Sequence, residues 1–220
     1  YINDQTLRLA NHGYTPVEIA EQVDFPPELA RHWAMRPYYG SVNHNVKATY
    51  SKYLGWFDGN PANLHTHPPE VAAKKYVELM GGADAVVEAA RAAYDEGDYR
   101  WVAEVVKHVV FADPDHAAGK QLLADAFEQL GYQAENGPWR NFYLTGAKER
   151  RDGVVVLPAP NAASPDSVRA MSIGTFLDYL GIRSDDGSYL RIGGLELNND
   201  SNHGEFTRAR RFLLNLRIED

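Results

Sequence analysis

The sequence predicts a mostly α-helical domain, a bundle of helical hairpins, followed by a shorter segment in which helix and strand mix. Apolar residues recur at helical spacing through about residue 150, as Val46, Tyr50, Tyr53 and Leu54 do. Glycines, prolines and capping residues divide this stretch into consecutive helices. Beyond it, the alternation of apolar and polar residues over 212–218 is typical of a half-buried strand.

Capping and stop residues set the expected limits of the helices. Thr15 and Glu18 form a capping box with proline at the first helical position, and Asp84 and Asp98 are expected to cap two later helices. Short connections between such helices imply antiparallel neighbours. The expected stops are Gly13, Pro26–Pro27, Gly55, Gly81–Gly82, Asp113–Asp115 and Gly131, and a last helix follows Asn136–Pro138.

One helical hairpin carries a repeat-like pattern. The stretch from Gly97 to Ala118 resembles the second helix and following loop of a tetratricopeptide repeat. Only about one and a half such units are present, fewer than the roughly three that a free-standing solenoid needs. We therefore expect the hairpins to bury their exposed face against the rest of the domain or against a second copy of it.

A change of composition marks the end of the helical domain. Prolines and alanines follow a β-branched run over 152–163, which indicates a linker. A helix is expected from Ser164 to Gly181, and a short strand over Tyr189–Ile192. Two strands and one helix are too few for an independent domain. We therefore expect a helical domain over 1–151, a linker over 152–163 and part of a further domain over 164–220.

Composition excludes several classes of function. The net charge of −8 argues against a nucleic-acid binder, which usually carries a basic face. The absence of cysteine excludes thiol catalysis, disulfides and thiolate metal sites. No apolar run approaches the roughly 20 residues that span a bilayer. The chain starts at Tyr1 within a helical pattern, so we expect it to be part of a larger protein.

The segment from Arg36 to Pro61 concentrates aromatic and amide side chains with one histidine and two tight turns. Arg36 and the Tyr38–Tyr39 pair can bind an anion such as sulfate or phosphate through charge-assisted hydrogen bonds, unless the two tyrosines are core residues. His44 stands between Asn43 and Asn45, where an imidazole can be a metal ligand, a general base, a capping group or a packed structural residue.

The remaining motifs give little indication of a catalytic or metal-binding site. His65 and His67 have the spacing of a metal-binding pair, but the aspartate and histidine that would complete a two-metal hydrolase motif are missing, and two prolines follow at once. His108 lies on a valine-rich helix and is expected to be structural. The sequence contains no phosphate-binding glycine loop and no nucleophile elbow. Nothing in these residues forms a complete active site.

Six sequence motifs are long and specific. They are Asp4–Leu9, Tyr38–Ala48, Tyr53–Ala62, Gly97–Glu104, Phe111–Pro114 and Gly131–Gly146. Together they resemble the alkyl sulfatases of the metallo-β-lactamase superfamily. The similarity is dense over about residues 1–150 and weaker over Ser164–Gly181, which resembles the start of that family's sterol-carrier-like C-terminal domain.

The resemblance implies a function for the parent protein. Such an enzyme has an N-terminal metallo-β-lactamase domain with two zinc ions and hydrolyses alkyl sulfate esters such as dodecyl sulfate to an alcohol and sulfate. Its helical domain forms the homodimer and closes over the active site. By position in the motif, His44 would be a zinc ligand, and Arg36, Tyr39 and Asn45 would contact sulfate. This chain alone is then expected to be inactive.

Two other functions compete with this one. The first is a non-catalytic helical-repeat module that binds a protein partner through its hairpins. The second is a lipid or sterol carrier, which the short C-terminal part disfavours because Gly193–Gly194, Asn198–Asn202 and Thr207–Arg211 depart from the expected pattern. The compartment stays open, with a periplasmic or secreted location preferred because detergents are met outside the cytosol.

Overall fold

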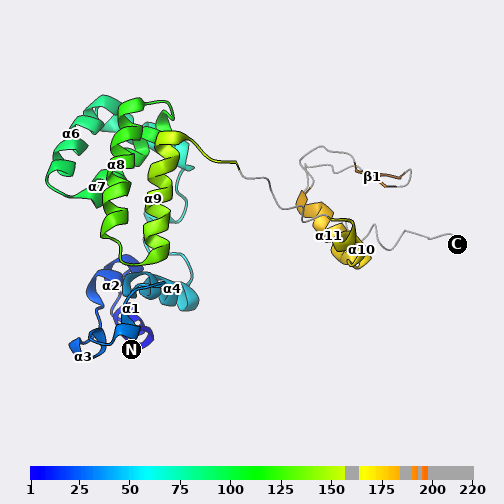
Figure 1. Cartoon of the computed structure of the whole chain (residues 1–220), viewed down its shortest axis with the longest axis horizontal. Coiled ribbons are helices and arrows are strands. Elements are labelled where there is room, and N and C mark those ends of the chain that lie inside the picture. Colours follow the sequence, from blue (N-terminus) through cyan, green and yellow to red (C-terminus); the bar gives the residue numbers. More distant parts are fainter. Residues whose placement is uncertain (157–163, 184–189, 193–194, 198–220) are drawn as a thin grey trace. The chain divides into compact units, whose positions relative to one another are not determined.

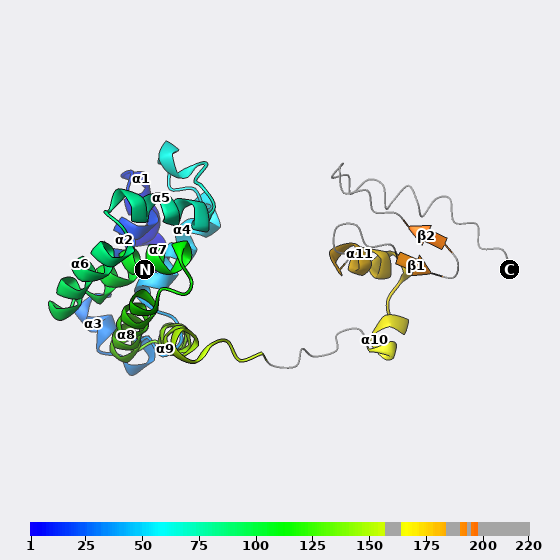
Figure 2. The ribbon, with the colours of Figure 1, turned by 90° about the horizontal axis from the view of Figure 1, so that it is seen from above.

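A computed structural model describes residues 1–156, 164–183, 190–192 and 195–197 (Figure 1). The chain divides into two compact units, Tyr1–Val156 and Leu157–Asp220. Figure 2 shows the first unit from above as a cluster of helices. The helices of this unit are α1 (Ile2–Asn11), α2 (Pro16–Gln22), α3 (Pro27–Ala30), η1 (Trp33–Met35), α4 (Val42–Leu54), η2 (Pro61–Asn63), α5 (Pro69–Leu79), α6 (Ala83–Asp95), α7 (Tyr99–Ala112), α8 (Ala117–Gln133) and α9 (Gly137–Asp152).

The first unit has two separate hydrophobic cores. The larger lies in the hairpin region, α5–α9, where α7 buries one face of valines against α6 and α8. Val102, Val106 and Leu122 are completely buried there. The smaller core lies in the N-terminal region, α1–α4, around Ile19 and Val46. Burying such side chains stabilises by about 1.5–3 kcal/mol each, so the hairpin region holds most of the apolar stabilisation.

An ion pair joins the two regions. Arg100, at the start of α7, lies 3.2 Å from Glu21 in α2 and donates hydrogen bonds to both of its carboxylate oxygens. This contact lowers the pKa of Glu21 through the guanidinium hydrogen bond, which acts more strongly than the partial burial that opposes it. The pair is exposed, so it contributes orientation more than stability.

Most predicted caps and stops are confirmed. Thr15 and Glu18 form the capping box, and Asp98 accepts a hydrogen bond from the backbone N–H of Trp101, 3.2 Å away. The prediction for Asp84 is wrong, because α6 begins at Ala83 with Gly82 as its N-cap, so Asp84 lies inside the helix. Asp84 instead lies 3.2 Å from the His116 ring, and that histidine caps α8.

Gly131 is the second corrected boundary. It does not end its helix, because α8 continues to Gln133 and the glycine is buried inside it. A Cβ atom added at Gly131 would lie 2.7 Å from the Cδ2 atom of Leu144 on α9. The glycine therefore serves close packing of two helices, a role that sequence pattern does not distinguish from a helix stop.

The second unit contains helices and a pair of short strands among its described residues. The single helix predicted from Ser164 to Gly181 is two, α10 (Pro165–Arg169) and α11 (Ile173–Arg183), and Gly181 lies within α11. Strands β1 (Leu190–Ile192) and β2 (Leu195–Leu197) pair antiparallel. The expected strand over 212–218 and the linker residues 157–163 lie outside the described residues. The domain limits and the sterol-carrier-like character stay predictions.

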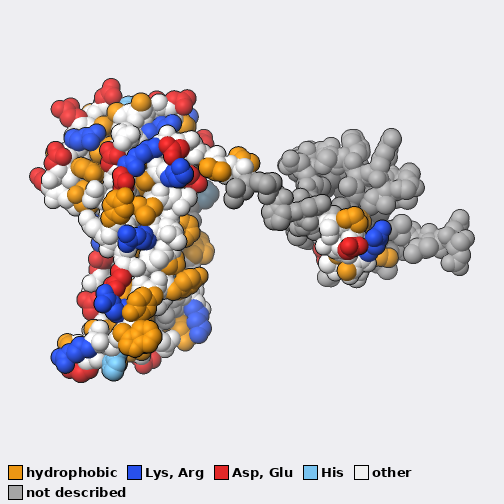
Figure 3. Space-filling view, viewed as in Figure 1, with side chains coloured by type: hydrophobic (Ala, Val, Ile, Leu, Met, Phe, Trp, Pro, Cys, Tyr) orange, Lys and Arg blue, Asp and Glu red, His pale blue; other side chains and the backbone are white. Residues whose placement is uncertain are grey.

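The fold class is thus mostly α-helical, as expected. Within the described residues, no helix combines the length and apolar character that crossing a membrane requires. Figure 3 shows acidic and basic side chains interspersed over the hairpin region, whereas hydrophobic side chains gather along the narrower part below it.

Candidate functional site

The predicted site residues lie where the chain enters α4, and the start of α9 holds this segment in place. The backbone N–H of Gly137 donates to the carbonyl of Tyr38 at 3.1 Å. The side chain of Asn136 donates to the carbonyl of Tyr39 and accepts from the N–H of Trp139 at 2.8 Å. Asn136 is only 4% exposed, so this buried amide is satisfied on both sides and ties two segments about 100 residues apart.

His44 lies in the first turn of α4, where Ser41 caps the helix by accepting from the His44 backbone N–H at 3.1 Å. Its ring meets the indole of Trp139 edge to face, with the centroids 6.3 Å apart and the planes at 75°. The indole Nε1–H donates to His44 Nδ1 at 3.4 Å. Because an indole nitrogen only donates, Nδ1 is the acceptor, and the neutral ring carries its proton on Nε2.

Zinc binding by His44 would require the hydrogen bond from Trp139 to be replaced. A ligating imidazole binds metal through a lone pair on one nitrogen and donates from the other. Here the lone pair of Nδ1 accepts the hydrogen bond from the indole N–H of Trp139, and Nε2 carries the proton and donates. The described residues also contain no group of three or more His, Asp or Glu side chains that could hold a metal ion. The zinc assignment of His44 therefore stays a prediction, and its co-ligands would have to lie elsewhere.

Two adjoining pockets surround the predicted residues. The first, called here the arginine pocket, has a volume of about 830 Å³ and includes Arg36, and the second, the histidine pocket, has about 500 Å³ and includes Tyr39 and His44. Gly40 and Asn45 line both. A Cβ at Gly40 would lie 3.1 Å from Asn45 Oδ1, so a side chain there would crowd the shared wall.

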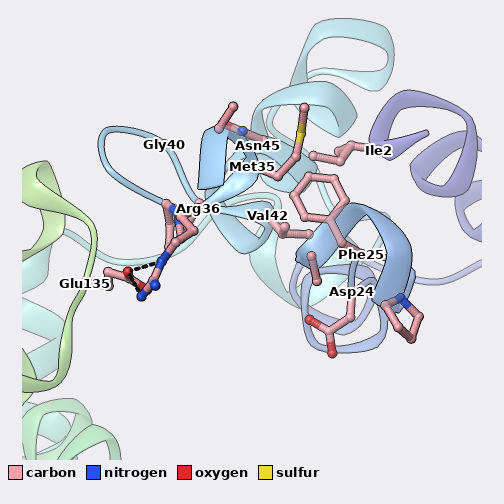
Figure 4. Close-up of a pocket in the computed structure, with 14 residues that line it drawn as sticks. Ile2, Asp24, Phe25, Met35, Arg36, Gly40, Val42, Asn45 and Glu135 are labelled. Carbon is pink, nitrogen blue, oxygen red and sulfur yellow. Dashed lines mark hydrogen bonds and ion pairs between the residues drawn. The ribbon is translucent and has the colours of Figure 1, made fainter. Parts of the chain in front are cut away.

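Arg36 stands at the polar end of the arginine pocket (Figure 4). Its Nε atom donates to Glu135 Oε1 at 2.8 Å, and its Nη2 atom reaches the same oxygen. Both side chains are about half exposed. Nη1 makes no hydrogen bond within the part of the chain that the structure describes, so it remains available to an anion.

The histidine pocket is built from aromatic rings and hydrogen-bond donors. Tyr39 and Phe142 are each 82% exposed at its sides. Lys47 places its ammonium group 6.0 Å from the centroid of the Trp139 ring. No acidic residue lines this pocket. Such a lining suits a ligand with an anionic group and an apolar body.

Sequence reasoning missed the residues contributed by α9. Asn136, Trp139 and Phe142 all come from one helix start, and the sequence signals were the turn that precedes it and the family motif Gly131–Gly146, to which no site role was assigned. His108 and the His65–His67 pair do not line the two pockets. His108 stacks on Tyr76 with ring centroids 4.6 Å apart, and burial lowers its pKa. His65 and His67 lie in the exposed connection between η2 and α5.

Comparison with known proteins assigns the chain to a family. The family model for alkyl sulfatase dimerisation matches residues 15–153, and the chain belongs to that family. This confirms the resemblance found in the sequence. The chain spans less than a third of the length of the relatives described next.

Three relatives illustrate the family. A linear primary-alkylsulfatase from Pseudomonas sp is 64% identical over 183 residues, which cover 83% of this chain and 27% of that protein. The alkyl/aryl-sulfatase BDS1 of Saccharomyces cerevisiae is 50% identical over 83% of this chain and 28% of its own length. The solved structure of the stereoselective inverting sec-alkylsulfatase Pisa1 from Pseudomonas sp. is 49% identical, with a TM-score of 0.78, over 84% of this chain and 29% of that chain.

Proposed function

We propose that this chain is the part of an alkyl sulfatase that joins two copies of the enzyme and forms one wall of its substrate site. Membership of the dimerisation family supports the first role. The observation that carries the second is the convergence of Tyr39, His44 and Asn45 with Trp139 at the histidine pocket. The substrate would be an alkyl sulfate ester, and the products an alcohol and sulfate.

The donors around the two pockets suit the sulfate group of such an ester. A sulfate monoester carries one negative charge and several acceptor oxygens. The Nε2–H of His44, the amide of Asn45, the hydroxyl of Tyr39 and Nη1 of Arg36 are all donors, and Glu135 pairs with the charge of Arg36 through other nitrogen atoms. These residues would bind and orient the ester. The zinc chemistry expected from the resemblance would come from residues outside this chain, so the chain alone is expected to hydrolyse nothing.

The test is a charge added to the wall that the pockets share. In the longer enzyme, Asn45→Asp keeps the side-chain shape but places a carboxylate beside the sulfate, and we expect KM to rise by about tenfold because a nearby like charge costs on the order of 1 kcal/mol. Asn141→Asp is the matched control, since Asn141 is exposed on α9 and lines neither pocket. Equal KM values for the two variants would show that Asn45 is remote from the substrate.

A second test addresses the dimer. Sedimentation of the 24.6 kDa chain at micromolar concentration should give the mass of two copies. A monomer at all concentrations would refute self-association by this region.

A further inference from the structure

The N-terminal region and the hairpin region are joined by polar contacts rather than by a shared core. Within residues 1–156, neither hydrophobic core includes a residue of the other region. In the same residues, every pair of helices that packs extensively lies inside one region, and Figure 1 shows α1–α4 below the hairpins. Between Tyr1 and Val156 the backbone passes from one region to the other once, through the connection 55–68, which is exposed over nearly all its length.

One group of contacts across this boundary comes from the start of α9 and the residue before it. Each contact is a hydrogen bond to the segment that enters α4. The three bonds run from Gly137 to the carbonyl of Tyr38, from Asn136 to the carbonyl of Tyr39 and from Trp139 to His44. Arg36 adds an ion pair with Glu135, which Figure 4 shows. The histidine pocket therefore spans the boundary, because one of its walls belongs to each region.

A second group of contacts lies where α2 meets α7. The two Nη atoms of Arg100 donate to the two carboxylate oxygens of Glu21, at 3.3 and 3.2 Å. The side-chain amide of Asn43 on α4 donates to the same carboxylate and to the carbonyl of Ala20, each at 3.2 Å. Glu21 thus joins three helices, and Asn43 immediately precedes His44 in the pocket wall. A bidentate arginine–carboxylate pair also fixes the relative orientation of its partners.

We infer that the Glu21–Arg100 pair controls the separation of the two regions and, with it, the opening of the histidine pocket. Glu21 and Arg100 line neither pocket, so they are positioning residues that act through Asn43 and α4. This role goes beyond the proposed function, because it depends on how the pocket is built and not on which ligand the pocket binds.

The polar character of the boundary favours such an opening. Interfaces between parts of one chain resist relative motion when they are large and hydrophobic, whereas small polar interfaces permit it. Exposed ion pairs and single hydrogen bonds each contribute little, because water replaces them when they break. Both cores stay buried when the regions separate, since neither core crosses the boundary. Separation of the regions therefore costs less free energy than unfolding of either core.

Hydrogen exchange of the chain itself, followed by NMR, measures this opening. The boundary reporters are the backbone N–H of Gly137 and the side-chain amide of Asn136, which both donate across the boundary. The core references are the backbone N–H groups of Val106 and Tyr50, one from each buried core. In the wild-type chain, the two boundary reporters should show similar protection, lower than that of either core reference.

Charge reversal tests the pair. Glu21→Lys places two cations opposite each other, so protection of both boundary reporters should fall by about tenfold, while that of the core references changes by less than about twofold. Adding Arg100→Glu restores opposite charges and should recover most of the protection. Arg100→Gln is a milder variant that removes the attraction alone, and it should lower the protection by about two- to fivefold.

The matched control is Asp152→Lys. It makes the same change of charge in the pair Lys148–Asp152, which is comparably exposed but lies within α9 alone. Protection of the boundary reporters should stay as in the wild type. A loss of protection equal to that in Glu21→Lys would mean that net charge, and not this pair, sets the opening, and would overturn the inference.

The other outcomes are distinct. Unchanged protection of Gly137 in Glu21→Lys, or no recovery on adding Arg100→Glu, would refute the role of the pair. A fall at Gly137 without a matching fall at Asn136 would mean that the opening does not reach the pocket. Equal protection of Tyr50 and Gly137 in the wild type would mean that the N-terminal region unfolds instead of separating. No substrate is used, so failure of the proposed function would leave all these exchange rates unchanged.

Discussion

The hairpin region and the N-terminal region of this chain differ in the size of their hydrophobic cores. The core of α5–α9 has ten buried residues, of which Val102, Val106 and Leu122 are completely buried, and the core of α1–α4 has six. Both regions also expose large apolar side chains, such as Phe142 at 82% in the hairpin region and Tyr39 at 82% in the N-terminal region. The larger core indicates that the hairpins supply most of the stability, whereas exposed aromatic side chains of both regions meet at the histidine pocket.

The largest loss of stability should come from truncating a buried side chain in the core of the hairpin region. Leu122→Ala removes a completely buried side chain and should lower the free energy of unfolding by about 2–5 kcal/mol. Leu54→Ala, at a residue that is 55% exposed at the end of α4, should cost well under 1 kcal/mol. Urea unfolding measures both. Similar costs for the two variants would remove the distinction between the regions.

Gly131 tests how closely α8 and α9 pack within the hairpin region. Helix propensity alone predicts that Gly131→Ala stabilises by up to about 1 kcal/mol. The structure predicts the opposite sign, a loss of about 1–3 kcal/mol, because the new Cβ would lie 2.7 Å from Leu144. Adding Leu144→Ala should then cost less in the Gly131→Ala background than alone, and a double-mutant cycle by urea unfolding measures the difference. Additive costs would mean that the two residues do not clash.

Trp139→Phe tests the donor that orients His44 in the site. The ring stays, but the N–H that donates to Nδ1 is lost, so we expect KM for alkyl sulfate in the longer enzyme to rise several-fold, in line with a net hydrogen-bond contribution of about 0.5–1.5 kcal/mol. Unfolding of the chain by urea should change little. The 15N signals of His44 should move as Nδ1 loses its partner, and unchanged signals would show that the indole does not contact it.

The smallest effect concerns pH. Burial among the hairpins lowers the pKa of His108 from its ordinary value of 6.5, so the unfolded chain binds this proton more readily than the folded one. The stability that the neutral ring contributes is fully present above pH 6.5 and is lost as pH falls through the lowered pKa. His108→Gln should therefore reduce the loss of stability between pH 7.5 and pH 5, as measured by thermal unfolding. The same loss in both proteins would contradict a role for His108.

The sequence predicted the parts of the fold that local chemistry decides. Caps and turns are local, so Thr15, Asp98 and Gly55 gave correct limits. It failed at Gly131 and Gly181, because a glycine that allows close packing or simply continues a helix looks the same in sequence as one that ends it. At Asp84, the neighbouring Gly82 was the cap.

The sequence predicted one of the two segments that form the candidate site. The segment from Arg36 to Asn45 was found from its unusual mixture of side chains. Its partners Asn136 and Trp139 were not, since only the fold brings them within hydrogen-bonding distance across nearly 100 residues. The partner of His44 was missed in the same way, because the indole N–H of Trp139 reaches Nδ1 from another helix.

The most direct test of this account is the zinc content of the longer enzyme with His44→Ala, measured together with KM. The proposed role of His44 as a hydrogen-bond donor to the sulfate predicts that zinc per protomer is unchanged and that KM for an alkyl sulfate rises, with His44→Gln partly restoring binding because its amide can donate in place of Nε2–H. Loss of zinc in His44→Ala, with no rescue by glutamine, would instead make His44 a metal ligand and contradict its role as a hydrogen-bond donor to the substrate.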